Sequence, residues 1–332
     1  MSPTKSLSEP LWWGLLSTAR INRALITPLR ASKRSKLVAV ASRTEEGAQA
    51  YAHKWRIPRP YGSYEAMLAE TDIDVIYNSL PNHLHAEWTI KAAQAGKHVL
   101  CEKPLALTID EVDAISAAAK KAGVVVAEAF MYRHHPQTFK VKELVDSGAV
   151  GSVRLVRGSF TFLLSRQDDV RLDPAMGGGS LWDVGCYPVS FARYLLGREP
   201  EEVMGWQMSG TSGVDEMFVG QMRFSEDVFA QFDSGFRAPF RTQVEIVGET
   251  GTLIIPNPFK PGRNAKIQLI HENEVQSIRV PGQELYIGEV EDMADAILHG
   301  KAPQVSLADS RANTSILLAL LESARLGKPV IL

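Results

Sequence analysis

The sequence is poor in cysteine, lacks a long apolar run and carries no excess charge of either sign. Two cysteines, Cys101 and Cys186, are too few for a disulfide framework and are expected to be reduced thiols in a cytoplasmic protein. No stretch approaches the roughly 20 apolar residues of a membrane helix. The polar start over residues 1–10 has no apolar signal core, so we expect a frayed tail there. A formal net charge of −2 argues against nucleic acid or an anionic membrane as a partner.

Glycine is missing where a dinucleotide-binding turn would need it. Residues 13–26 read WGLLSTARINRALI, with Ser17, Ala19 and Asn22 at the three glycine positions of G-x-G-x-x-G. Ala19 is small enough for a pyrophosphate to approach, hydroxyls can donate to phosphate oxygens, and the helix that follows offers free amides. We therefore expect a modified cofactor turn with φ below zero at all three positions. The expected cofactor contacts in this turn are Ser17, Thr18, Ala19, Arg20 and Ile21.

The sequence does contain a regular alternation of strands and helices over its first part. A chain of 332 residues suits two domains. The alternation predicts an α/β domain over residues 1–128, a Rossmann-type doubly wound parallel sheet that binds ligands at the carboxyl ends of its strands. The segments expected as strands are 11–16, 36–42, 74–80, 98–102 and 124–127. The segments expected as helices are 20–31, 45–55, 64–69, 85–95 and 109–122.

Residues 129–332 have a different pattern. Strand-like segments follow one another with few helices between them, which predicts an α+β domain with a large, mainly antiparallel open sheet. The expected strands are 153–163, 202–208, 217–224, 228–236, 242–247, 252–255, 266–271 and 275–280. The expected helices are 179–196, 287–299 and 307–325.

The loop after the second strand indicates which dinucleotide is bound. NAD-specific folds carry an acid there, whereas this chain has Ser42 and Arg43. Arg43 can hold a 2′-phosphate through two hydrogen bonds, so NADP is the expected cofactor. Glu45 and Glu46 keep NAD possible, although they suit a helix N-terminus better.

A third loop is expected to border the cofactor through Leu80, Asn82 and His85. The histidine-rich stretches in this loop and at residues 134–135 raise the question of a metal. Because no carboxylate or thiolate completes a ligand pattern, we expect no metal site.

Two motifs connect the chain to a known family. Residues 101–104 read CEKP, and residues 177–187 read GGGSLWDVGCY. E-K-P followed about 80 residues later by G-G-G-x-x-x-D-x-G-x-[HY] is a specific combination. With the modified turn, it resembles the Gfo/Idh/MocA oxidoreductases over nearly the whole chain. The branches most alike are dimeric dihydrodiol dehydrogenases, NADP-dependent D-xylose 1-dehydrogenases and sugar ketoreductases, which also have Tyr where inositol-type enzymes have His.

The resemblance implies roles for individual residues. Lys103 is the expected catalytic lysine and a cofactor contact, and Tyr187 is the expected general acid/base. A phenol titrates near pH 10, so a nearby ammonium would be needed to lower its pKa. Asp183 lies one helical turn earlier and can bind a substrate hydroxyl or orient Lys103. Glu102 can orient Lys103 or line the cofactor pocket. An exposed lysine and a core tyrosine remain the structural alternatives.

Together these features predict an NADP-dependent dehydrogenase or reductase acting on CH–OH groups of a sugar or related cyclic polyol. The alternatives are a nucleotide-deoxysugar ketoreductase and a non-catalytic dinucleotide-binding sensor, although a sensor needs neither Lys103 nor Tyr187. Phe229, out of step with the buried face of its strand, and the family resemblance predict a homodimer or a dimer of dimers. The candidate substrate residues are Arg133, Arg166, Asp169, Arg171, Asp183 and Tyr286.

Overall fold

The computed structural model describes residues 9–166, 168–272 and 274–332. The tail expected over residues 1–10 lies outside the described residues, except for its last two. The chain forms two compact units: residues up to 131 with 286–311, and residues 132–285 with 312–332. Whereas the sequence analysis assigned all residues after 128 to one domain, the structure groups 286–311 with the first unit. None of the helices in the described part of the chain is long and apolar enough to cross a membrane.

The first unit is built on a parallel sheet. Among the described residues its strand order is β3-β2-β1-β4-β5-β6, which confirms the doubly wound arrangement. The order reverses between β1 and β4, and ligands bind at such switch points in open α/β sheets. The strands are β1 (Leu11–Leu16), β2 (Ser35–Ala41), β3 (Arg59–Tyr61), β4 (Val75–Asn78), β5 (His98–Glu102) and β6 (Val126–Ala129).

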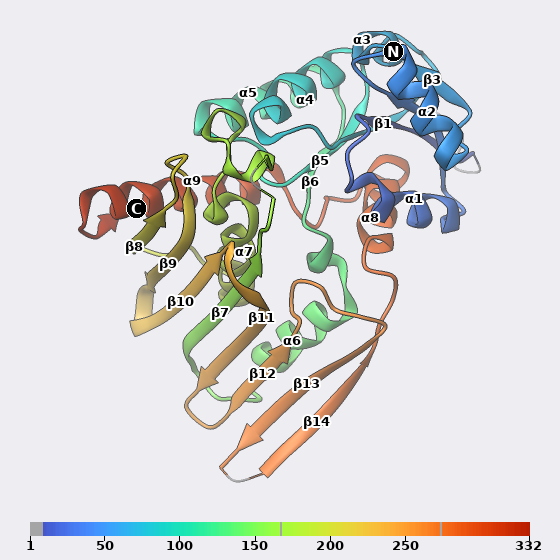
Figure 1. The fold of residues 1–332 in the computed structure, drawn as a ribbon. Helices are drawn as coiled ribbons and strands as arrows, with labels where there is room; N and C mark the ends of the chain where they lie inside the picture. The colour runs from blue at the N-terminus through green and yellow to red at the C-terminus, as the bar shows by residue number, and fades with distance from the viewer. Residues whose placement is uncertain (1–8, 167, 273) are drawn as a thin grey trace. The chain divides into compact units, whose positions relative to one another are not determined.

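Helices cover both faces of this sheet (Figure 1). One apolar cluster joins the sheet to α3, α4 and α5, and a second joins it to α1, α2 and α8. The helices are α1 (Asn22–Ala31), α2 (Glu45–Trp55), α3 (Tyr64–Leu68), α4 (His85–Gln94), α5 (Ile109–Ala122) and α8 (Ile287–His299). Val290, Met293 and Ala294 are completely buried in the second cluster, so α8 supplies part of the core of the first unit.

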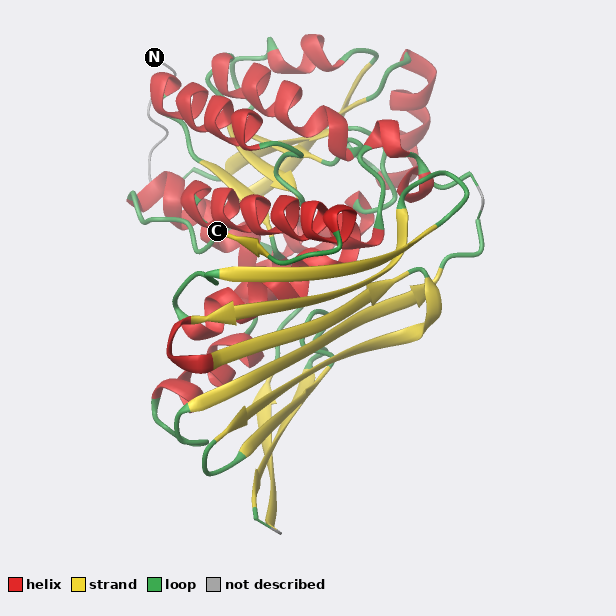
Figure 2. Cartoon of the chain, turned by 90° about the vertical axis from the view of Figure 1, so that its left-hand side faces the viewer, coloured by secondary structure: helices red, strands yellow, loops and turns green. Residues whose placement is uncertain are grey.

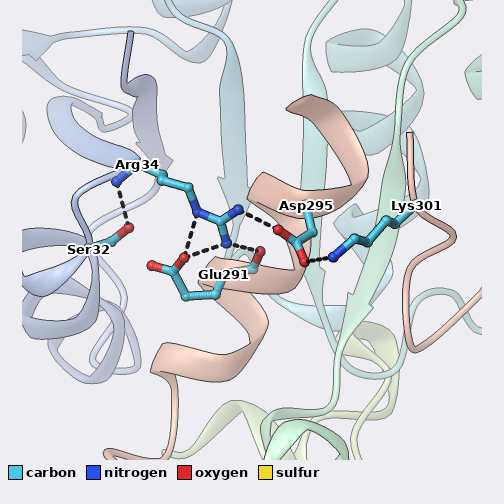
Figure 3. Close-up of polar contacts among 5 residues, drawn as sticks. All are labelled: Ser32, Arg34, Glu291, Asp295 and Lys301. Carbon is cyan, nitrogen blue, oxygen red and sulfur yellow. Dashed lines mark hydrogen bonds and ion pairs between the residues drawn. The ribbon is translucent and has the colours of Figure 1, made fainter. Parts of the chain in front are cut away.

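An ion-pair network also ties α8 to the first unit (Figure 3). Arg34, just before β2, donates from Nε to Glu291 Oε2 at 2.8 Å and from Nη2 to the Glu291 carbonyl at 2.9 Å. It also pairs with Asp295, which accepts from Lys301 Nζ at 2.7 Å. The hydrogen bonds from Arg34 and Lys301 lower the pKa of Asp295 to about 2.

The second unit contains a larger sheet (Figure 2). Its strand order among the described residues is β14-β13-β12-β11-β7-β10-β9-β8-β15. Only β7 and β10 pair in parallel there, which confirms the mainly antiparallel sheet. The strands are β7 (Val153–Leu163), β8 (Glu202–Ser209), β9 (Asp215–Phe224), β10 (Val228–Gly235), β11 (Arg237–Gly248), β12 (Thr252–Pro256), β13 (Asn264–His271), β14 (Glu274–Pro281) and β15 (Val330–Ile331).

The helices of this unit include one that was not expected. α6 (Pro136–Asp146) begins after His135, whose Nδ1 accepts from the Gln137 amide at 3.1 Å. The helix expected over residues 179–196 is instead a π-helical turn, Leu181–Gly185, followed by α7 (Cys186–Leu196). α9 (Leu307–Leu326) begins in the first unit and continues in the second.

Candidate active site

The turn after β1 corrects the expected backbone geometry. Ser17 has φ of 138°, a conformation that favours glycine, whereas Ala19 and Asn22 keep negative φ. Ser17 thus occupies a glycine-type position with a side chain attached. The expectation of negative φ at all three positions is therefore wrong at Ser17.

A buried polar network explains how this turn is held. Ser79 Oγ donates to Asn22 Oδ1 at 2.6 Å, which uses its single proton. Ser17 Oγ, 2.8 Å from Ser79 Oγ, is then the donor of that pair, and it accepts from the Ala19 amide at 3.1 Å. Asn22 Nδ2 donates to the Ser17 carbonyl at 2.8 Å. While this network is intact, the Ser17 proton points to Ser79 and Thr18 is the exposed hydroxyl of the turn.

The helix after the turn has the chemistry of an anion site. α1 has no side-chain cap and no acid in its first turn. By contrast, α2 is capped by Thr44 and α5 by a capping box formed by Thr108 and Glu111, and both helices have acids in the first turn. The first amides of a helix lack intrahelical acceptors and attract negative charge. The residues present therefore fit the pyrophosphate of a dinucleotide.

The loop after β2 exposes the basic residue expected to select the cofactor. Arg43 is exposed and Ser42 is half-buried, with the Ser42 amide bonded to the Tyr61 carbonyl at 3.0 Å. Glu45 and Glu46 lie in the first turn of α2, as the sequence predicted, where they complement the helix dipole. Arg43 thus presents an exposed positive charge at the carboxyl end of β2.

The loop after β4 is joined to the CEKP turn by a histidine. His85 is buried; its Nδ1 lies 2.7 Å from the Pro104 carbonyl and its Nε2 2.7 Å from the Leu80 carbonyl. Burial lowers the pKa of His85 to about 4, while the two carbonyls favour the doubly protonated ring. His85 therefore supports two loops of the expected cofactor site, and its direct contact with the cofactor stays a prediction. Asn82 lies beside this loop, half-buried.

Two carboxylates, half-buried Glu102 and buried Glu128, support the turn that carries Lys103. Lys103 and Glu102 are half-buried at the carboxyl end of β5. The Tyr77 hydroxyl donates to Glu102, and the Leu105 amide donates to Glu128 Oε1 at 2.9 Å. Burial raises the pKa of Tyr77, and the Glu102 charge adds to this shift, so Tyr77 stays a hydrogen-bond donor. Sequence reasoning missed Tyr77 and Glu128; a polar residue in a strand otherwise read as buried was the available signal.

In the second unit, Asp183 is held by an arginine. Arg171 Nε donates to Asp183 Oδ2 at 2.6 Å, and Arg171 Nη1 donates to Asp169 Oδ1 at 3.1 Å. The charge of Asp183 raises the pKa of Arg171. Three residues proposed as independent substrate contacts therefore form one group, in which Arg171 fixes the carboxylate of Asp183 on the π-helical turn.

Tyr187 lies in an aromatic cluster at the start of α7. Its ring centroid is 5.2 Å from Phe160, 5.6 Å from Phe259 and 5.8 Å from Tyr132. Only 5% of its surface is exposed. The cluster fixes the ring, because a buried aromatic side chain with several ring neighbours has few alternative rotamers.

Asp215 anchors the entry to the π-helical turn and was also missed. Its Oδ2 accepts from Ser180 Oγ and from the Leu181 amide, both at 2.7 Å, and burial raises its pKa to about 6. Gly179 has φ of 123°, and a Cβ there would lie 2.3 Å from Asp215 Oδ1. A Cβ on Gly178 would lie 2.5 Å from the Arg171 carbonyl. The glycines therefore let the chain pass close to its own backbone and to Asp215.

The remaining candidates are placed as follows. Arg133 is buried, with its guanidinium 4.1 Å from the Tyr194 ring centroid, and Arg166 is exposed and paired with Asp168. Tyr286 packs against the apolar cluster around α1 and α8. Across the described ranges, no three His, Cys, Asp or Glu side chains gather as metal ligands. Cys101 and Cys186 are both buried and unpaired with each other.

Two family models match the chain. An oxidoreductase family with an NAD-binding Rossmann fold matches residues 13–130, and the GFO/IDH/MocA C-terminal domain matches residues 138–254. The chain therefore belongs to the Gfo/Idh/MocA oxidoreductases, as its motifs indicated.

Individual relatives cover almost the whole chain. It is 37% identical to D-xylose 1-dehydrogenase (NADP(+)) 2 of Haloferax volcanii, over 96% of this chain and 99% of that protein. It is 32% identical to trans-1,2-dihydrobenzene-1,2-diol dehydrogenase of Xenopus laevis, over 93% and 97%. A solved 3-ketoreductase from Actinomadura kijaniata, in complex with NADP and TDP-benzene, is 29% identical with a TM-score of 0.90, over 95% and 98%.

Proposed function

We propose that this protein is an NADP-dependent oxidoreductase that acts on a hydroxyl or carbonyl carbon of a sugar or related cyclic polyol. The observation that carries the proposal is that each candidate side chain is supported within its own unit. In the first unit, the Leu105 amide of the Lys103 turn donates to buried Glu128. In the second, Arg171 holds Asp183, and Phe160 packs against Tyr187. A non-catalytic sensor would need none of these groups. The name of the Haloferax relative supports both the sugar and the cofactor.

The cofactor half of the proposal depends on two features of the first unit. The uncapped, acid-free N-terminus of α1 would hold the pyrophosphate, and exposed Arg43 with Ser42 would hold a ribose 2′-phosphate. Carboxylates in this loop would repel that phosphate, but Glu45 and Glu46 belong to the first turn of α2. NADP is therefore preferred over NAD.

The protein's own groups would manage the proton and the substrate. A bound nicotinamide supplies the hydride chemistry. Tyr187 would exchange the proton of the reacting hydroxyl, and a neighbouring ammonium, the role that the family resemblance gives to Lys103, would favour the phenolate that accepts it. Asp183, fixed by Arg171, would accept a hydrogen bond from a second hydroxyl of the substrate. Glu102, fixed by Tyr77, would orient Lys103.

A second candidate function is the reduction of a nucleotide-linked keto-deoxysugar. It is favoured by the likeness to the Actinomadura 3-ketoreductase, whose solved structures include variants with a tyrosine changed to phenylalanine and a lysine changed to alanine. The same three residues would serve this reaction, so only the substrate distinguishes the two functions.

The test is turnover with a matched pair of substrate panels. Purified protein would be incubated with NADP⁺ and aldoses or cyclic diols, and separately with NADPH and nucleotide-linked 3-keto sugars, while absorbance at 340 nm is followed. Tyr187→Phe should lower kcat by about 10²- to 10⁴-fold without lowering NADPH affinity. Tyr194→Phe, a matched change on the same helix, should leave kcat unchanged. NADPH binding without turnover of any substrate would favour the sensor.

We also infer that the protein assembles through its larger sheet and works in the cytoplasm. Trp206, Met208, Val219 and Phe229 are exposed, while Phe232 on the alternate face of its strand is buried. Apolar side chains of this size on one sheet face support a homodimer, or a dimer of dimers. Two buried cysteines that form no disulfide with each other support a reducing compartment.

A further inference from the structure

The hydrogen bond between Ser17 and Ser79 joins the two loops at the switch point of the parallel sheet. Ser17 directly follows β1 and Ser79 directly follows β4, and the two strands pair with Leu16 opposite Asn78. The hydroxyls are separated by 62 residues in the chain and lie 2.8 Å apart. Both residues are buried, and Asn22, which completes the network, is fully buried.

Ser79 is held in place by hydrogen bonds of the preceding residue, Asn78, which ends β4. Asn78 Nδ2 donates to the His85 carbonyl and to Thr89 Oγ1, both at 3.1 Å, and Asn78 Oδ1 accepts from the Leu80 amide at 3.3 Å. These bonds fix the backbone on both sides of Ser79. Its hydroxyl is therefore a rigid acceptor for Ser17 and a rigid donor to Asn22.

We propose that Ser79 is a positioning residue for the cofactor: through Ser17 and Asn22 it holds the turn of residues 17–21 in the shape that receives the pyrophosphate. A serine at φ of 138° needs outside support that a glycine would not need, because its Cβ disfavours this conformation. Ser79 supplies that support through its hydroxyl, 2.8 Å from Ser17 Oγ, and more distantly through its carbonyl at 3.3 Å, while Asn22 holds the Ser17 carbonyl. The loss of glycine from the turn thus makes cofactor binding depend on a residue in another loop. This inference rests on the cofactor site proposed above.

A double-mutant cycle of Ser17 and Ser79, with NADPH affinity as the readout, tests whether cofactor binding depends on Ser79. Ser79→Ala should weaken NADPH binding, measured by fluorescence titration, by about 10-fold or more, because Ser17 loses the nearer of its two acceptors on Ser79 and Asn22 loses its donor. In the Ser17→Gly background, where glycine adopts the conformation unaided, the same change should weaken binding by less than about 3-fold. Adenosine 2′-monophosphate lacks the pyrophosphate, so its affinity for Ser79→Ala, measured by competition, should stay within about 2-fold of the parent.

Matched variants separate this role from a general loss of structure. Ser35 is buried in the same unit and its hydroxyl has no hydrogen-bond partner among the described residues, so Ser35→Ala should not change NADPH binding. If Ser79→Ala does not fold, the Ser17→Gly/Ser79→Ala protein should fold and bind NADPH, since its turn no longer needs the hydroxyl. Failure of that double variant to fold would overturn the inference.

The binding results also separate this inference from the proposed function. An NADPH affinity of Ser79→Ala within 2-fold of the parent's would overturn the inference without contradicting the proposed cofactor site. So would an equal loss of affinity in the parent and Ser17→Gly backgrounds. Equal weakening of NADPH and adenosine 2′-monophosphate would also overturn it, because the effect would not be centred on the pyrophosphate. A parent protein that binds no NADPH would overturn the proposed function itself.

Discussion

The exposed guanidinium of Arg43 lies beside Ser42, which takes the place of the acid that an NAD-specific fold carries. We expect Arg43→Ala to weaken NADP binding by about 1.5–3 kcal/mol through loss of charge-assisted hydrogen bonds to the 2′-phosphate, and to change NAD binding little. Lys54→Ala, an exposed cation at the far end of α2, is the control. Calorimetric titration that finds NAD bound more tightly than NADP by the parent would contradict the cofactor assignment.

The raised pKa of the single residue Asp215 leads to a second prediction, which concerns how the free energy of unfolding varies with pH. Its pKa is near 6 in the folded chain and lower when unfolded, so the folded chain keeps its proton longer as pH rises. The free energy of unfolding therefore falls with rising pH between about pH 4 and 6.

Asp215→Asn removes this ionisation. The free energy of unfolding of the variant, measured by urea unfolding at each pH, should rise relative to that of the parent as pH increases. The change should total about 2 kcal/mol between pH 4 and pH 7. Glu249→Gln, an exposed control, should not reproduce that slope. A constant difference between Asp215→Asn and the parent across this range would show that Asp215 titrates normally.

At the scale of the element, the N-terminus of α1 should be sensitive to side-chain size. Ala19 is half-buried in the turn that leads into the helix. Ala19→Val should abolish NADPH binding by obstructing the pyrophosphate while leaving the thermal unfolding temperature nearly unchanged. Ala24→Val, at the third residue of α1 and also half-buried, is the control. Parent-like binding by Ala19→Val, in fluorescence titration, would mean that the cofactor does not cross this turn.

How well the elements could be predicted depended on where their determinants lie in the chain. α5 has the bounds expected from sequence because its capping box and its C-cap Gly123 are local signals. α6 was missed because His135 is an unusual cap, and β3 because it has three residues including Pro60. The π-helical turn begins with a hydrogen bond from the Leu181 amide to Asp215, which is far away in sequence, so no local pattern could predict it.

The same distinction applies to the candidate site. Lys103 and the GGGSLWDVGCY motif could be found because each is contiguous in the sequence. The conformation of Ser17 could not be predicted, because the hydroxyl that stabilises it belongs to Ser79, at the end of another strand. Arg171 and Asp183 were both candidate substrate residues, but their pairing could not be predicted, since sequence alone does not show which charges pair.

For the whole molecule, we predict assembly larger than the 36.5 kDa chain. Trp206 and Val219 are opposite one another on β8 and β9, and both are about half exposed. Light scattering at micromolar concentration should give a dimer or tetramer, and Val219→Arg should shift it toward monomer by placing a charge in the apolar face. Gln221→Arg, on the same strand but already polar, should have a smaller effect. A 36.5 kDa particle for the parent would refute the prediction.

The return of residues 286–311 to the first unit has a consequence for synthesis on the ribosome. The parallel sheet emerges early, yet the apolar surface that Val290, Met293 and Ala294 cover stays open until α8 has been made. At about 5–20 residues per second, that wait is roughly 10 to 35 s. The nascent chain is then most exposed to chaperones and proteases, and a product that stops short of α8 presents the same uncovered face permanently.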